Sequence, residues 1–155
     1  MDRGQADIVV ADLGRQLGIA SLALDDSGMG ILALDESGMI VSFGYNPNAG
    51  TIDLMTCLDR VEPSPARSLA AMRANFGWSA AGCQTLAIDQ STGAFVLQRR
   101  YVGADLVEGG LAGAVEGLVA EAERWTQRLA SIADRPSQDP APQANGGLRP
   151  GGLRA

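Results

Sequence analysis

Two near-copies of an acidic segment lie close together near the start of the chain. LALDDSGM spans residues 22–29 and LALDESGM spans residues 32–39, so each copy joins two adjacent acidic side chains to a serine and a glycine. Grouped carboxylates can bind calcium, and paired carboxylates can act as acid and base in glycoside hydrolysis. The two segments therefore raise two chemical possibilities, a metal site and an active site.

The spacing of the acids fits neither chemistry. An EF-hand calcium loop alternates its oxygen ligands, whereas the acids in both copies are adjacent. A carboxylate on a solvated turn also lacks the burial that tunes a catalytic acid. Asp, Ser and Gly form turns, because short polar side chains bond to the nearby backbone and glycine accepts a positive φ. We interpret the first copy as the turn into a β meander and the second as the turn of its first hairpin, and we predict no metal site.

Other catalytic constellations are missing as well. The sequence has no histidine, which excludes Ser-His-Asp triads, Cys-His pairs and the usual zinc sites. Its two cysteines, Cys57 and Cys83, are too few for a secreted disulfide scaffold, so we expect both to be reduced. The glycine-rich GLRPGGLR near the C-terminus lacks the P-loop lysine. We predict that the protein is not an enzyme and binds no cofactor.

Composition and charge narrow the class of protein further. The chain has 155 residues and a formal net charge of −6, and this acidity disfavours nucleic acid because phosphates would be repelled. No apolar run approaches the roughly 18 residues that a membrane span needs, and the acidic start does not resemble a signal peptide. We expect a cytoplasmic protein with no membrane insertion. It would have one domain over residues 1–133 and a disordered tail rich in Pro and Gly over residues 134–155.

Hydrophobic periodicity predicts the elements that hold these turns. Helices are predicted at residues 6–18, 62–76 and 104–132. Strands, separated by strong turn signals, are predicted at residues 29–35, 39–46, 51–61, 83–89 and 95–102. The order α-β-β-β-α-β-β-α predicts an α+β fold with an antiparallel sheet flanked by helices. The apolar residues of the last helix step by four and three from Leu111 to Ile132. This spacing favours packing on the sheet over a self-associating seam.

Several segments, in their order along the chain, resemble class I type III secretion chaperones, the Tir-chaperone-like family. They are LALDDSGMGILALDESGMIVSFGY, a helix ending LAAMRANF, GCQTLAIDQSTGAFVLQRRY, and EAERWTQRL in the last helix. The resemblance covers roughly residues 6–132. It implies a bacterial homodimer that binds the N-terminal segment of a secreted effector in extended form and keeps it competent for secretion. The secretion ATPase is a candidate further partner, and no cofactor is implied.

The resemblance and the apolar pattern together predict two binding surfaces. A one-layer sheet buries only one face in its own core, so surplus apolar residues on the first helix and the meander indicate a partner site. The candidate effector-binding residues are Val9, Leu13, Leu17, Ile31, Val41 and Phe43. This choice depends on strand register, since a shift of one residue exchanges the two faces.

The second surface is a dimer interface on the second helix and the strand after it. A face of small alanines on that helix permits close approach, and the candidate contacts are Leu69, Met72, Trp78, Leu86 and Ile88. Two other functions stay open at this stage. One is a small ligand-binding or sensory α+β module with an apolar cavity under the sheet. The other, less favoured, is an enzyme whose active site uses one of the acidic pairs.

Overall fold

The computed structural model describes residues 1–34, 38–76, 84–106 and 110–133. Within them the α-helices are α1 Arg3–Gln16, α2 Pro65–Phe76 and α3 Gly110–Ala130. The strands are β1 Met29–Leu34, β2 Met39–Asn46, β3 Thr51–Cys57, β4 Gln84–Ile88 and β5 Phe95–Val102, and a 3-10 helix spans Gly103–Leu106. This order confirms the predicted α-β-β-β-α-β-β-α arrangement. The predicted disordered tail lies outside the described residues.

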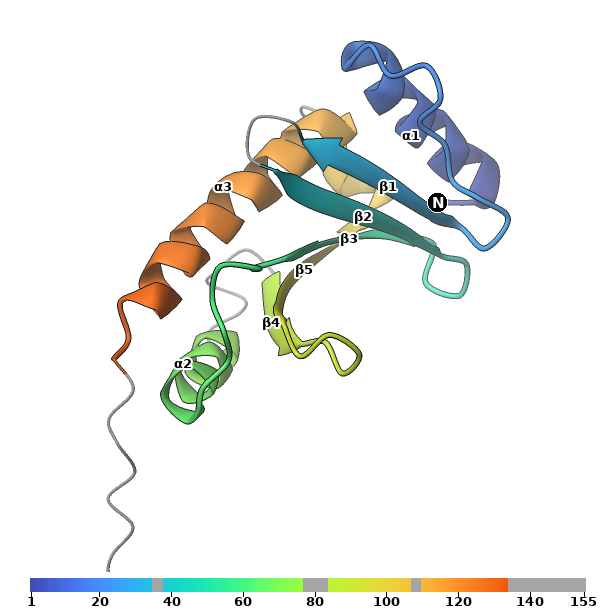
Figure 1. Cartoon of the computed structure of the whole chain (residues 1–155). Coiled ribbons are helices and arrows are strands. Elements are labelled where there is room, and N and C mark those ends of the chain that lie inside the picture. Colours follow the sequence, from blue (N-terminus) through green and yellow to red (C-terminus); the bar gives the residue numbers. More distant parts are fainter. Residues whose placement is uncertain (35–37, 77–83, 107–109, 134–155) are drawn as a thin grey trace, which may run out of the picture.

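The five strands form one antiparallel sheet in the order β1-β2-β3-β5-β4. Helix α3 packs on β3 and β5 and also contacts α1, whereas α2 lies beside β4 at the far end of the sheet. Figure 1 shows α1 and α3 together on one side, with α2 set apart from them. Alternate residues of β1, β2 and β3 are buried, so one face of the sheet, here called the inner face, forms the core under α1 and α3. The other face is here called the outer face.

Helix α1 begins earlier than the apolar pattern predicts, because a capping box precedes it. The Asp2 carboxylate accepts a hydrogen bond from the Gln5 backbone N–H, and the Gln5 side chain accepts one from the Asp2 N–H. Two of the N–H groups that a helix start leaves unpaired are satisfied in this way. The helix ends at Gln16, and Gly14 must be glycine, since a Cβ there would lie 2.6 Å from the Ile19 carbonyl oxygen.

Helix α3 begins at Gly110 rather than at the predicted residue 104, and residues 103–106 form a 3-10 turn instead. Gly110 has a φ of +61°, a backbone conformation that glycine adopts without a steric penalty. The apolar stripe of the helix is buried at Leu111, Val115, Leu118, Ala122, Trp125 and Leu129. The stripe therefore packs into the core of its own chain, as predicted in preference to a self-associating seam.

The first acidic copy is a turn, as predicted. The Asp25 Oδ1 accepts hydrogen bonds from the Ser27 backbone N–H, the Ser27 hydroxyl and the Met29 N–H. Gly28 follows with a φ of +82°. The second copy lies between β1 and β2, but residues 35–37 are outside the described part of the chain. Among the residues that are described, no three His, Cys, Asp or Glu side chains gather where they could hold a metal ion.

Candidate partner-binding surfaces

Three of the six predicted effector-binding residues belong to the core instead. Leu13, Val41 and Phe43 are each no more than 1% exposed. Val41 and Phe43 lie on the inner face of β2, which α1 and α3 cover. In this structure these three side chains therefore pack within their own chain instead of lining a groove. For Val41 and Phe43 the cause is the pairing of β2, which turns them to the inner face, and for Leu13 it is the packing of α1 on the core.

The other three predicted residues, Val9, Leu17 and Ile31, lie at different places on the molecule. Ile31 pairs with Ser42, which lies between the inward-facing Val41 and Phe43 and therefore points to the outer face. The Ile31 side chain shares that face and is 67% exposed. Val9 on α1 is partly buried against the core, and Leu17, just after α1, is exposed. Of the predicted set, Ile31 alone lies on the outer face of the sheet. We therefore examine the strand that carries Ile31, β1, as a binding site for the effector.

Strand β1 is an edge of the sheet, and part of its backbone is unpaired. The Tyr45 N–H donates to the Gly28 carbonyl, which fixes the alternation of hydrogen bonds between β1 and β2. The even-numbered residues of β1 consequently turn their N–H and C=O groups toward β2, and Ile31 and Ala33 turn theirs outward. Within the described residues, no partner bonds to the outward groups of Ile31 and Ala33. These two residues form an open edge.

At Met29, two residues before Ile31, the outward backbone groups of β1 already have partners. Met29 also turns its backbone outward, but its N–H donates to the Asp25 carboxylate at 2.9 Å and its carbonyl accepts from the Asp25 N–H at 2.7 Å. The turn that the first acidic copy makes thus ends the open edge at Met29. A strand added to β1 could hydrogen-bond to the backbone of Ile31 and Ala33 but not to that of Met29.

The outer face next to this edge is apolar. Met29 and Ile31 on β1 and Ile40 on β2 are all exposed, and the register places Ile31, Ser42 and Met55 in one row across three strands. Further along the sheet the same face becomes charged, since the Arg100 guanidinium on β5 donates two hydrogen bonds to the Asp53 carboxylate on β3. This ion pair raises the pKa of Arg100. Exposed apolar side chains are therefore more numerous beside β1 than beside β5, where Val102 is exposed.

The opposite edge of the sheet, β4, is blocked at its middle residue, Leu86, by a side chain of α2. The Asn75 amide donates to the Leu86 carbonyl at 2.8 Å, and its oxygen accepts from the Leu86 N–H at 2.9 Å. The side chain of Leu86 itself is only 6% exposed, so in this structure little of it is accessible to the second subunit that it was predicted to contact. Asn75 was not singled out from the sequence, although it stands in the segment ANF that the resemblance uses.

Helix α2 turns its large apolar residues away from the molecule. Leu69, Met72 and Phe76 are 47%, 69% and 94% exposed, whereas Ala71 on the opposite side is buried. These three residues, here called the α2 stripe, stand three and four positions apart and so share one helix face. Ile88 on β4 is also exposed, and Trp78 lies outside the described residues. Phe76 was missed as a candidate, although its spacing from Leu69 and Met72 is visible in the sequence.

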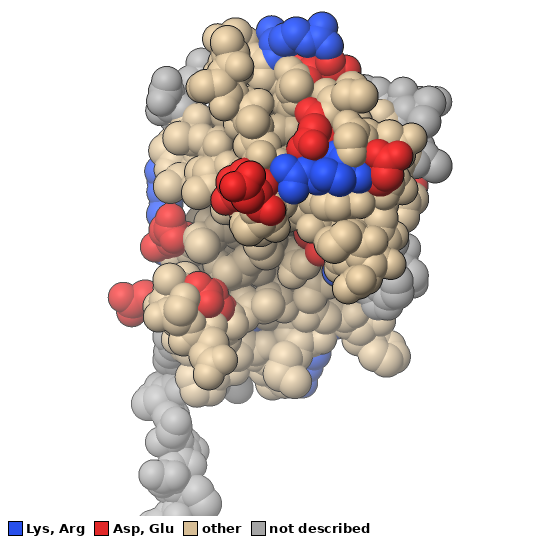
Figure 2. All heavy atoms as spheres, turned by 90° about the vertical axis from the view of Figure 1, so that its right-hand side faces the viewer, with Lys and Arg blue, Asp and Glu red and all other residues tan. Residues whose placement is uncertain are grey.

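Charged side chains on the side where α1 and β1 lie are mixed in sign. Seen from the right-hand side of Figure 1, arginines and acidic residues gather next to one another in the upper part of the surface (Figure 2). On α1, ion pairs join Arg3 to Asp7 and Arg15 to Asp12. Charge alone therefore does not define a binding site on this side. No helix in the described part of the chain is long and apolar enough to cross a membrane.

Three solved structures share the fold of this chain. A chain of the ExsC–ExsE complex matches with a TM-score of 0.73 at 21% identity, over 86% of this chain and 100% of that chain. A chain of the HopA1–SchA chaperone–effector complex matches with a TM-score of 0.65 at 16% identity, over 77% and 91% of the two chains. A chain of the heterodimeric ExoU–SpcU complex from the type III secretion system of Pseudomonas aeruginosa gives 0.54 at 20% identity, over 78% and 94%. At these identities the likeness shows a shared fold.

Sequence comparison identifies the family. No curated protein matches the chain. The model of the Tir chaperone protein (CesT) family, however, matches residues 9–126, which include α2, all five strands and most of α1 and α3. Because this match spans well over half of the sequence, the chain belongs to the Tir chaperone protein (CesT) family.

Proposed function

We propose that this type III secretion chaperone binds the N-terminal segment of its effector as an extended strand along β1. The family and the chaperone–effector fold establish the class, a chaperone of secreted effectors rather than an enzyme, which agrees with the sequence-based prediction. They also decide against a small-ligand or sensory module. What remains to be proposed is the place of binding, and the single observation that carries it is the open edge at Ile31 and Ala33.

An open edge offers backbone hydrogen bonds that depend little on the sequence of the partner. A strand laid against β1 can pair with the outward N–H and C=O groups of Ile31 and Ala33, and such main-chain bonds supply affinity in strand-addition complexes. The closure at Met29 limits the paired stretch to a few residues. The segment that fits is therefore short and extended where it meets β1, which suits an effector held in a non-globular form.

Specificity would come from side chains next to that edge. Alternate residues of an added strand point to the same face, so every second residue would lie beside Ile31 on the outer face. The exposed apolar side chains there, Met29, Ile31 and Ile40, favour apolar partners. We expect the effector segment to alternate apolar residues with others over about five positions.

Replacing Ile31 by proline tests this site directly. Proline removes the outward N–H of residue 31, and edge strands tolerate proline because the inner ladder keeps its bonds. After the effector has been identified by mass spectrometry of polypeptides that co-purify from the native host, the affinity for its N-terminal segment is measured by calorimetry. Ile31→Pro is expected to weaken binding by about tenfold or more.

The matched control is Ile31→Thr, which keeps both the backbone N–H and a β-branched side chain. It is expected to bind more tightly than Ile31→Pro, because it loses apolar contact but no hydrogen bond. Unchanged affinity in Ile31→Pro, with an intact circular dichroism spectrum, would place the effector segment elsewhere on the chaperone.

We further propose that two copies of the chain associate through the α2 stripe. Three large apolar side chains at 47–94% exposure on one helix face are unusual for a surface that meets only water. A two-fold interface uses the same patch on both subunits, so a stripe of this kind can pack against itself. Ile88 lies on β4, the strand that α2 contacts, and would extend the interface. A stable dimer of this type buries on the order of 1,000 Å² or more.

Acidic substitutions in the stripe test the dimer. The double variant Met72→Asp, Phe76→Asp is expected to convert a dimer into a monomer in light scattering, because two buried carboxylates would face two others across the interface. Its circular dichroism should stay the same, since neither side chain belongs to the core. Ile8→Asp is the control, because Ile8 on α1 is 62% exposed and lies outside the stripe. A dimeric mass for the double variant, or a monomeric mass for the unmodified chain, would contradict the proposal.

The proposed role also implies where the protein acts. Effectors are held before export, so we infer that the chaperone works in the bacterial cytoplasm and that the secretion ATPase receives the loaded complex. Family membership supports the first inference. The second rests on the role alone and is tested by co-purification of the ATPase with the loaded chaperone.

A further inference from the structure

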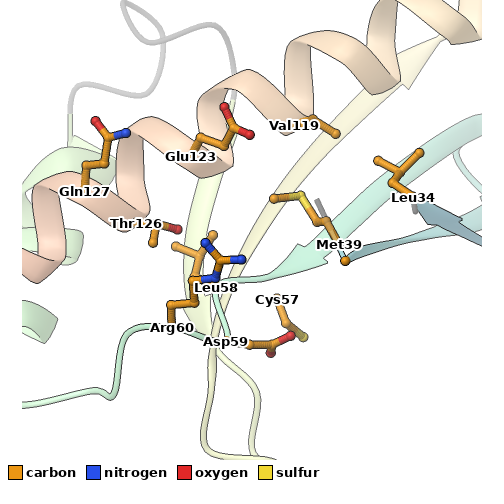
Figure 3. Close-up of a pocket in the computed structure, with 11 residues that line it drawn as sticks. Leu34, Met39, Cys57, Leu58, Asp59, Arg60, Val119, Glu123, Thr126 and Gln127 are labelled. Carbon is orange, nitrogen blue, oxygen red and sulfur yellow. The ribbon is translucent and has the colours of Figure 1, made fainter. Parts of the chain in front are cut away.

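A hollow of about 980 Å³ lies between α3 and one end of the sheet. Its apolar wall includes Leu34, Met39 and Leu58 from the sheet side and Val119 from α3. Figure 3 shows Val119 directed toward Met39 and Leu34 across the hollow. The α3 part of the wall continues to Gln127, which is only three residues before the helix ends at Ala130.

The rim of this hollow carries two acidic side chains and one arginine. Asp59 and Glu123 both line it together with Arg60, and none of the three forms an ion pair with a described residue. Figure 3 shows the Arg60 side chain extending up toward α3, and Glu123 projecting from α3. The Cys57 thiol in the same wall has a raised pKa, first because it is buried and then because Asp59 and Asp89 are negatively charged. The hollow thus suits a segment that carries both apolar and positively charged side chains.

The end of the same chain has this chemistry. Residues 146–155 read GGLRPGGLRA, in which the pairs Leu148–Arg149 and Leu153–Arg154 repeat and no acidic residue occurs. This segment lies beyond the family match, which ends at residue 126. It is a feature that the shared chaperone fold does not account for.

The attachment point lies close enough for the segment to reach the hollow. Val119 stands 11 residues before the end of α3, which corresponds to about 17 Å along the helix. For a random coil, the about 15 residues between residues 133 and 148 would give a root-mean-square span of roughly 20 Å. Tethering at that length gives a local concentration in the millimolar range, so weak contacts suffice for occupancy.

We propose that residues 146–155 occupy this hollow in their own chain. The leucines of the two Leu-Arg pairs contact the apolar wall, and the arginines lie near Asp59 and Glu123. The chain thereby covers an apolar surface of its own that would otherwise attract other polypeptides. An apolar and basic segment of a partner would have to displace this part of the chain to enter.

A spin label on the full chain tests the proposal. Cys57 and Cys83 are replaced by alanine, and Gly152→Cys carries a nitroxide between the two arginines. The methyl signals of Val119 and Met39 are expected to lose most of their intensity by paramagnetic broadening. Val102 serves as the internal reference, because β5 pairs with β3 in a register that places it about 20 Å from the hollow.

Neutralising the rim separates specific docking from chance contact. The double variant Asp59→Asn, Glu123→Gln is expected to restore the Val119 and Met39 signals, whereas Glu116→Gln, at an exposed position of α3 outside the hollow, should leave the broadening in place. Broadening spread evenly over the surface, or broadening that survives the double variant, overturns the proposal. Broadening that passes from a labelled chain to an isotope-enriched unlabelled one also overturns it, since a second copy would then be the occupant.

Discussion

The two edge strands of the sheet, β4 and β1, differ in whether their outward backbone groups have hydrogen-bond partners. At β4 the amide of Asn75 bonds to both backbone groups of Leu86, so a helix blocks the middle of that edge. At β1 the outward groups of Ile31 and Ala33 have no partner among the described residues. Unpaired edges invite association with other strands, and proteins commonly block them. An edge left open beside exposed apolar side chains therefore indicates a place for a partner strand. The capped Leu86 shows how a side chain of the same protein can block strand pairing at one position.

Asn75 at Leu86 and Asp25 at Met29 also show which groups can replace a neighbouring strand as hydrogen-bond partners of an edge strand. An amide has both a donor and an acceptor, so Asn75 pairs with the N–H and the C=O of Leu86 by itself. A carboxylate only accepts, so Asp25 uses its carboxylate for the Met29 N–H and its own backbone N–H for the Met29 carbonyl. The aspartate must therefore lie in a turn that brings its backbone against the strand. This requirement explains why the acidic copy stands immediately before β1.

Amide hydrogen exchange should separate the two edges most strongly. The N–H groups of Ile31 and Ala33 are expected to exchange nearly unprotected in the free chaperone and to slow by about a hundredfold when the effector segment is bound. The Leu86 N–H, paired with Asn75, should be protected in both states. Protection measured residue by residue by NMR gives the comparison. Slow exchange at Ile31 in the free protein would mean that the edge already has a partner and would remove the basis of the proposed site.

Loss of the Asn75 amide is expected to have a smaller effect, and on stability. Asn75→Ala leaves the N–H and C=O of Leu86 partly buried without partners, which should lower the free energy of unfolding by about 1–3 kcal/mol. Asn48→Ala is the matched control, because Asn48 is exposed in the β2–β3 turn and its side chain has no hydrogen bond to any described residue. Urea denaturation measures both variants. Equal stability of the two would show that water replaces Asn75 at no cost.

The types and order of the elements could be predicted from the sequence, because periodicity and turn residues act locally. The Asp25 turn, the Ser64 start of α2 and the buried stripe of α3 all follow from such local signals. The faces of the strands could not be predicted with equal certainty. Whether Ile31 shares a face with Val41 depends on how β1 pairs with β2, and the register, with Ile31 opposite Ser42, puts them on opposite faces.

Apolar spacing likewise did not distinguish the helices. The residues of α3 and the α2 stripe both recur every three to four positions, yet α3 buries Leu118 completely whereas α2 leaves Phe76 94% exposed. The difference comes from the residues on the other side of each helix. Small residues such as Ala71 allow α2 to lie close to the molecule on that side. A helix that packs its small residues inward leaves its large apolar residues exposed and available to a partner. Which face packs inward depends on the tertiary structure and cannot be read from the apolar spacing.

The Asp25 closure should show the smallest effect, as a pH dependence. The pKa of Asp25 is lowered, chiefly because the Ser27 hydroxyl donates to its carboxylate and next because the Met29 N–H does. A carboxyl group with a lower pKa in the folded state stabilises the fold when ionised. Its contribution is therefore complete above the unfolded pKa, near pH 4, and is lost as the pH falls through the folded value. The difference in unfolding free energy between the unmodified chain and Asp25→Asn, followed by urea denaturation, should stay constant from pH 7 to about pH 5 and shrink below about pH 4.

Asp89 provides the control that ties this effect to the β1 edge. Its pKa is also lowered, first by the Ser91 backbone N–H, but it lies in the turn between β4 and β5. Asp89→Asn should show a similar pH dependence of stability, while only Asp25→Asn should speed the exchange of the Met29 amide.

If the Met29 amide stays protected in Asp25→Asn, the neutral amide oxygen of the new side chain accepts its hydrogen bond as well as the carboxylate does. Asp25→Ala, which removes the acceptor altogether, must then expose Met29 and lengthen the open edge by one pair. An Asp25→Ala variant that keeps Met29 protected would show that the backbone of the turn alone ends the edge.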